Sequence, residues 1–96
     1  MFTLRASISY HNSLRKLVRS NESIKIRLMS VLKKLSLNPT DSSLQSHKVN
    51  TVDHGVCWSS RVTGDIRIIW DYDSSKKLSL ILLDIGGHSG SHRVYK

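Results

Sequence analysis

The chain has 96 residues, of which 39% are hydrophobic, and this fits one domain with a small core and excludes wholesale disorder. Fifteen lysines and arginines against seven acidic residues give a net charge of +8, which predicts attraction to phosphates or to an acidic partner. The alternative is a basic surface that serves only solubility. The single cysteine, Cys57, excludes an internal disulfide, favours a reducing, cytoplasmic setting and is expected to be buried. The first ten residues hold no apolar run of signal-peptide length and no stretch is long enough to span a membrane, so we expect no membrane partner.

The chain begins with a predicted strand and a short helix. Residues 2–8 alternate apolar and polar side chains, which is typical of a half-buried strand. A helix is then expected over residues 12–19. The apolar residues that recur at helical spacing here are Tyr10, Leu14, Leu17 and Val18.

A second, longer helix is the clearest local prediction. Ser20 or Asn21 is expected to cap its first free amides. Lys33 and Lys34 lie in its last turns, where they complement the negative end of the helix dipole. The helix should end at Asn38, because the residue before Pro39 is disfavoured in the helical conformation. Its apolar stripe consists of Ile24, Leu28, Val31, Leu32 and Leu35.

The second half of the chain predicts antiparallel strands joined by short turns. The last strand is apolar on both faces, which favours a central place in the sheet. The expected fold class is therefore α+β, a single two-layer domain over residues 1–96 in which an N-terminal strand and a two-helix hairpin pack on a mainly antiparallel sheet of about four strands. The predicted strands cover residues 44–52, 56–62, 66–72 and 78–85, with turns at 63–65 and 73–76.

The histidines do not form a metal-binding pattern. His88 and His92 have the spacing of metal ligands on a helix, but the glycines and serines between them cannot hold a stable helix. No second cysteine and no pair of carboxylates completes such a site. His11 and His54 belong to no pattern and are expected to be surface or structural residues. We therefore expect no metal and no other cofactor.

Charged side chains converge on the predicted sheet. Arg61 and Arg67 flank one hairpin turn, with Asp65 inside it, and cross-strand partners of an antiparallel pair share a face. Two adjacent arginines repel each other unless an anion lies between them, and a phosphate is the obvious anion. The residues expected to lie near them are His47 and Lys48 at the start of the sheet and His88, His92, Arg93 and Tyr95 in the C-terminal segment.

Each of these residues also has a purely structural interpretation. Arg67 can pair with Asp71 in a surface salt bridge, and Asp65 can be a turn residue. His47 can cap a loop, and Tyr95 can cover the core. If the cluster is functional, RNA cleavage is the natural chemistry, because RNA supplies its own nucleophile, the 2′-hydroxyl. The protein then needs only a base, an acid and positive charge at the phosphate, and histidine, with a pKa of about 6.5, can serve in either proton role.

Several segments together resemble the RelE/ParE toxin superfamily, in particular the YafQ-like and RelE-like messenger-RNA interferases. The resemblance covers nearly the whole chain, including the helical hairpin that ends at residues 37–39. It implies a RelE-like fold and the toxin of a type II toxin–antitoxin pair, with an antitoxin, messenger RNA and the ribosome as partners. It also implies an endoribonuclease that cuts messenger RNA in the ribosomal A site without a metal. The segments that carry the resemblance are LQSHK (44–48), WSSRVTGDIRIIW (58–70), DIGGH (84–88) and RVY (93–95).

The resemblance to the YafQ branch assigns some of the site residues. By similarity, His47 matches a histidine used there in proton transfer, and Asp65 matches an acidic residue of the same site. His88 matches the histidine of a Gly-x-His segment. Arg61 stands where YafQ-like proteins carry a second histidine, so the roles of acid and base stay open.

The RelE branch supplies the remaining assignments. Arg67 matches an arginine that helps to hold the scissile phosphate, and Tyr95 takes the place of a C-terminal tyrosine or of an aromatic residue in the YafQ branch. We favour His47 or His88 for proton transfer and the two arginines for the phosphate. Further contacts with RNA are expected from Lys33, Lys34, Lys48, His92 and Arg93.

Two other functions remain open at this stage. One is a ParE-like toxin that inhibits gyrase without cutting RNA, although a pure binder has no need of proton-transfer groups. The other is an inactive relative that only binds an antitoxin or RNA.

Overall fold

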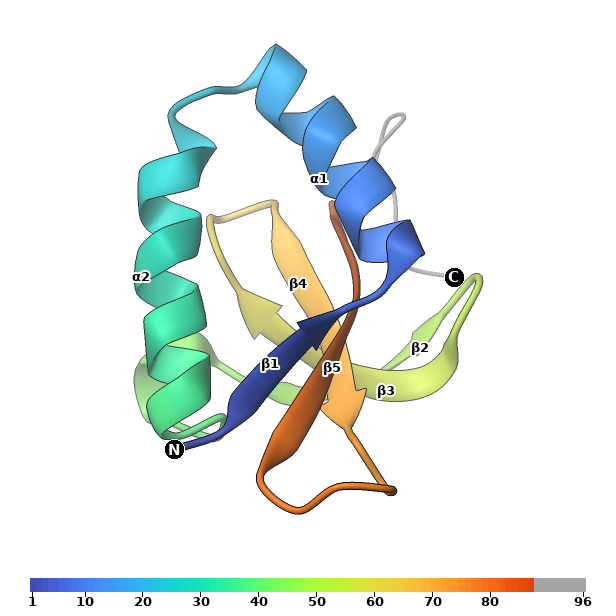
Figure 1. The fold of residues 1–96 in the computed structure, drawn as a ribbon. Helices are drawn as coiled ribbons and strands as arrows, with labels where there is room; N and C mark the ends of the chain where they lie inside the picture. The colour runs from blue at the N-terminus through green and yellow to red at the C-terminus, as the bar shows by residue number, and fades with distance from the viewer. Residues whose placement is uncertain (88–96) are drawn as a thin grey trace.

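A computed structural model describes residues 1–87 and shows two helices and a five-stranded sheet (Figure 1). The strands lie in the order β1-β5-β4-β3-β2, and every neighbouring pair is antiparallel except β1 with β5, which is parallel. The α+β class and the mainly antiparallel sheet are confirmed, and the sheet has five strands where about four were expected. The elements are β1 (Thr3–Ala6), α1 (Ile8–Ser20), α2 (Ile24–Leu37), the 3₁₀ helix η1 (Ser42–Leu44), β2 (His47–Thr51), β3 (Gly55–Arg61), β4 (Arg67–Tyr72) and β5 (Ser79–Gly86).

The boundary between β1 and α1 lies earlier than the sequence pattern predicts. The Ser7 hydroxyl accepts a hydrogen bond from the amide of Tyr10 at 3.0 Å, so it caps α1 at its first turn. The same hydroxyl donates to the carbonyl of Leu83 in β5 at 3.0 Å. Ile8, which continues the apolar alternation, is 79% exposed as the first residue of the helix. The strand therefore stops at Ala6, and the expected helix over residues 12–19 is too short.

The second helix packs as predicted, but it begins differently. Its N-cap position is Ser23, which makes no side-chain capping bond, and the Ser20 hydroxyl instead donates to the carbonyl of Leu17. The expected capping by Ser20 or Asn21 is therefore wrong. The helix ends before Pro39, since Asn38 has an extended conformation. No helix within residues 1–87 combines the length and the apolar character needed to cross a membrane. The buried residues of the stripe are Ile24, Leu28, Val31 and Leu35.

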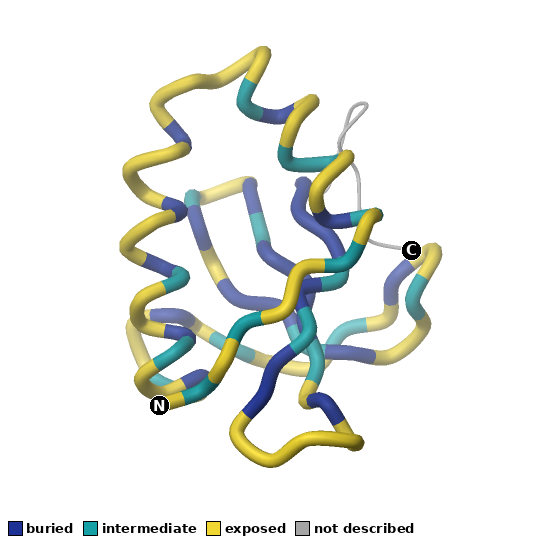
Figure 2. Tube along the Cα trace, in the orientation of Figure 1, coloured by how far each residue is buried: buried dark blue, intermediate teal, exposed yellow. Residues whose placement is uncertain are grey.

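The main core lies between the helices and one face of the sheet, where Trp70 is fully buried and stacks on Trp58 at 5.5 Å between ring centroids. A smaller apolar cluster on the opposite face contains Cys57 and Ile69. Burial raises the pKa of the Cys57 thiol, consistent with the expected structural role. Figure 2 shows buried residues along the strands and on the sides of the helices that face them. No helix of residues 1–87 packs on the opposite face.

A directed chain of hydrogen bonds connects this core to the loop before β2. The Trp70 indole N–H donates to the Ser60 hydroxyl at 2.7 Å, and the hydroxyls of Ser60 and Ser46 lie 2.6 Å apart. Ser46 donates to the carbonyl of Pro39 at 2.6 Å. Because a carbonyl only accepts, the single proton of Ser46 is committed to Pro39, and Ser60 must donate to Ser46. Each hydroxyl therefore both accepts and donates.

We predict that Ser60→Ala lowers the free energy of unfolding by about 1–3 kcal/mol, because it leaves the buried Trp70 N–H without an acceptor. Urea denaturation followed by tryptophan fluorescence measures this change. The matched control is Ser74→Ala in the exposed turn between β4 and β5, which should change stability by less than about 0.5 kcal/mol. Equal stability of the two variants would show that the chain of hydrogen bonds contributes nothing.

Candidate functional site

The two arginines predicted to stand together are direct cross-strand partners. Arg61 at the end of β3 pairs in register with Arg67 at the start of β4, and Arg67 also pairs with Gly86 in β5. Val62 and Ile68, which follow them in sequence, belong to the core beneath the helices. The Cβ atoms of the arginines are therefore directed to the opposite face, on which no helix of the described residues packs.

Arg67 is only partly exposed, and its Nη1 atom is buried without a hydrogen-bond partner among residues 1–87. It does not form the expected alternative salt bridge with Asp71, whose carboxylate instead accepts from the amide of Tyr72 at 2.8 Å. A buried cationic donor without an acceptor costs free energy, and a bound anion would remove that cost. The structural interpretation of Arg67 as half of a surface salt bridge is thus wrong.

His47 occupies the first position of β2, directly opposite Ser59 and on the same face as the arginine pair. Its Nδ1 lies 2.9 Å from the carbonyl oxygen of Gln45. Because a carbonyl cannot donate, Nδ1 must carry the proton, and Nε2 of the neutral ring is then left as an acceptor. The ring is exposed. His47 therefore both binds its loop and presents a nitrogen that can take a proton.

The position of His47 depends on two serines that the sequence analysis did not single out. Ser46 immediately precedes it and is held through Ser60 to the core. Just before Ser46, the backbone turns sharply at Gln45, which has a left-handed conformation with φ of 49°. Isolated serines carry no sequence signal for such tertiary contacts, so nothing in the pattern could have identified them.

Asp65 lies in the turn between β3 and β4, as its structural interpretation predicts. The Thr63 hydroxyl accepts from the amides of Asp65 at 3.3 Å and Ile66 at 2.9 Å, which fixes the turn. The carboxylate of Asp65 reaches the end of β5, where a Cβ atom added to Gly87 would lie only 2.6 Å from Oδ2. Because Gly87 has no side chain, the Asp65 carboxylate can approach it closely. The residue before it, Gly86, is the cross-strand partner of Arg67.

The other predicted RNA-binding residues are not all in this cluster. Lys48 alternates with His47 along β2 and lies over the ring of Trp58, 5.9 Å from its centroid, so it belongs to the other face. Lys33 and Lys34 are exposed on α2, and Lys34 lines a pocket to which Arg61 also contributes. The remaining predicted residues, His88, His92, Arg93 and Tyr95, lie outside the described residues.

One further pair on this face was not predicted. Nε2 of His54 lies 3.4 Å from Oδ2 of Asp84, and the two side chains are only 19% and 10% exposed. Asp84 is in register with Ile69, so the pair joins the β2–β3 turn to β5 across the face. His54 is thus structural, as expected, but its partner is distant in sequence and leaves no local pattern. Within residues 1–87, no three His, Cys, Asp or Glu side chains gather in a way that could hold a metal ion.

Solved structures of known toxins share this arrangement of helices and strands. A YoeB/ParE toxin from Agrobacterium tumefaciens is 15% identical with a TM-score of 0.70, over 92% of this chain and 100% of its own. YafQ from Escherichia coli is 15% identical with a TM-score of 0.68, over 91% and 93%. A copper-bound mutant toxin from Helicobacter pylori is 23% identical with a TM-score of 0.67, over 92% and 96%. The chain has the RelE/ParE toxin fold.

The RelE/ParE fold confirms the resemblance seen in the sequence at the level of architecture. The sequence itself matches no protein-family model and no curated protein. The geometry of this chain and the resemblance are therefore the two grounds on which the site residues are assigned.

We predict that the neutral imidazole of His47 carries its proton on Nδ1, because the Gln45 carbonyl accepts only from a protonated Nδ1. Nitrogen-15 chemical shifts of the ring at pH 8 report the tautomer directly. The exposed His11 on α1 serves as the control and should show mainly the Nε2–H tautomer favoured in free histidine. An Nε2–H tautomer at His47 would remove the basis for using Nε2 as a proton acceptor.

Proposed function

We propose that this protein is the toxin of a type II toxin–antitoxin pair and that it cuts messenger RNA in the ribosomal A site without a metal ion. The observation that carries the proposal is the pair formed by Arg61 and Arg67, in which a buried guanidinium nitrogen has no partner within residues 1–87. Such a pair needs an anion, and the fold shared with known toxins makes an RNA phosphate the anion of choice.

The geometry suits cleavage by the 2′-hydroxyl of the RNA itself. Nε2 of His47 takes the proton of the 2′-hydroxyl as that oxygen attacks the adjacent phosphorus. Arg61 and Arg67 bind the non-bridging oxygens and stabilise the negative charge that builds up on them. The bond from phosphorus to the 5′-oxygen then breaks, which leaves a 2′,3′-cyclic phosphate, and the departing oxygen takes a proton from an acid. His88 is the candidate for that acid by resemblance, and Asp65 lies next to Gly87, the residue before it.

A cognate antitoxin is the second proposed partner. YafQ from Escherichia coli has been solved in complex with DinJ, its antitoxin. In this chain, Ile26 and Met29 are 78% and 71% exposed on the outer side of α2, one helical turn apart. Exposed apolar side chains on a strongly basic protein fit an acidic partner that covers this helix. We therefore place the antitoxin on the outer surface of α2.

We predict that induced expression of the protein creates new 5′ ends within messenger RNAs, which primer extension detects. Arg67→Gln should reduce this cleavage by about 100-fold or more, because it removes a donor aimed at the charge of the transition state. The matched control is Arg15→Gln on the exposed side of α1, which should retain nearly full cleavage.

Two outcomes contradict the proposal in different ways. Altered DNA supercoiling without new 5′ ends would identify a gyrase inhibitor and exclude the nuclease. Undiminished cleavage by Arg67→Gln would retain the nuclease but exclude the arginine pair as its phosphate site.

A further inference from the structure

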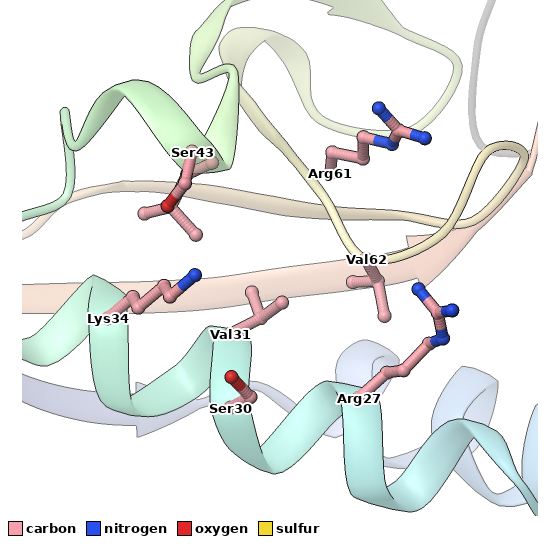
Figure 3. Close-up of a pocket in the computed structure, with 8 residues that line it drawn as sticks. Arg27, Ser30, Val31, Lys34, Ser43, Arg61 and Val62 are labelled. Carbon is pink, nitrogen blue, oxygen red and sulfur yellow. The ribbon is translucent and has the colours of Figure 1, made fainter.

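A second cationic pocket lies beside the proposed site, between α2 and the ends of η1 and β3 (Figure 3). Its volume is about 240 Å³. Arg27, Ser30 and Lys34 of α2 line one side, while Ser43 of η1 and Arg61 of β3 line the other. The pocket thus combines three positively charged residues with the hydroxyl of Ser30, while the hydroxyl of Ser43 donates to Asp41.

The spacing of the residues along α2 explains why they face one way. Arg27, Ser30 and Lys34 are three and four residues apart, so they lie above one another on a single side of the helix. Val31 lies between them and is nearly buried against the core, which holds this side of α2 at the sheet edge. The pocket is therefore built by ordered elements.

The described part of the chain neutralises the charges in the pocket only in part. The ion pairs within residues 1–87 that do not depend on the protonation of a histidine join other residues, namely Arg5 with Asp73 and Lys25 with Glu22. No acidic side chain of residues 1–87 lines the pocket itself. The neighbouring Asp41 accepts bonds from the hydroxyl and amide of Ser43 at 2.7 and 2.9 Å, and its pKa is lowered by these bonds and then by the charge of Lys34. Three cations gathered in this way favour a bound anion.

Arg61 connects the pocket to the arginine pair. Strand β2 begins at His47 opposite Ser59, so Arg61 lies beyond the end of β2, on an edge of β3 that no other strand of residues 1–87 covers. Arg61 lines the pocket and is also the cross-strand partner of Arg67. Figure 3 shows its guanidinium directed away from α2, so the pocket and the arginine pair adjoin at this residue.

We propose that the pocket binds a second phosphate of the same RNA chain, next to the phosphate held by Arg61 and Arg67. This inference rests on the proposed nuclease function and deepens it. A row of phosphates in one strand matches two adjoining cation sites that share an arginine, and a phosphate accepts from guanidinium, ammonium and hydroxyl donors alike. Such a contact positions the strand without reading its bases.

Binding of single-stranded RNA with 2′-O-methyl groups throughout tests the proposal, because this RNA keeps its phosphates but cannot be cut. Fluorescence anisotropy is measured over a range of salt concentrations. The double variant Arg27→Gln/Lys34→Gln should bind about tenfold more weakly for every RNA sequence, the value of one charge-assisted contact. The slope of log affinity against log salt should fall by about 0.7, as expected for one lost phosphate.

The matched control is Lys76→Gln/Lys77→Gln, which removes the same charge from the exposed turn between β4 and β5 and should keep the slope of the unmodified protein. Thermal unfolding of both variants checks the fold, which should be unaffected because all four side chains are exposed.

Equal slopes for the two double variants would contradict the proposal that the pocket binds an RNA phosphate. Unchanged RNA binding by Arg27→Gln/Lys34→Gln, together with loss of binding to the acidic antitoxin, would assign the pocket to the protein partner instead. In either case, new 5′ ends made by the unmodified protein in cells would leave the nuclease proposal standing. If the protein neither binds this RNA nor cuts messenger RNA, both the pocket proposal and the nuclease proposal are wrong.

Discussion

The indole nitrogen of Trp70 begins the chain of hydrogen bonds that runs through Ser60 and Ser46 to the carbonyl of Pro39. Since each donor has only one acceptor to which it can point, the rotamers of both hydroxyls are fixed together. The residue after Ser46 is His47, so the proposed base is connected through two serines to the buried Trp70 and is not held by its exposed loop alone. The helices contribute to the site by burying Trp70.

Several acidic side chains are engaged in contacts of their own, which leaves positive charge available to bind anions. Asp73 is held by Ser75 and Arg5, which lower the pKa of its carboxyl to about 2. Asp41 and Asp84 are likewise occupied by Ser43 and His54. These carboxylates stabilise turns and strands and do not neutralise the arginines at the end of β3. Arg61 and Arg67 therefore keep their charge available where the two proposed phosphate sites meet.

Parity along the strands made the arginine pair predictable, because two residues that flank a short hairpin turn must share a face. The limits of strands 56–62 and 66–72 were also nearly right for the same reason. Sequence alternation failed at Ile8, where an N-cap overrides the pattern, and it could not reveal His54 with Asp84 or the contribution of Arg27. These features depend on contacts between distant residues, which leave no periodic trace.

The parallel pairing of β1 with β5 has a consequence for synthesis. The Ser7 hydroxyl bonds to the carbonyl of Leu83, 76 residues further along the chain, and β5 lies between β1 and β4. A growing chain can therefore form its helical hairpin early, but it cannot close this sheet until β5 has left the ribosome. Until then the nascent protein lacks the completed face that carries Arg67, because β5 pairs with both β1 and β4.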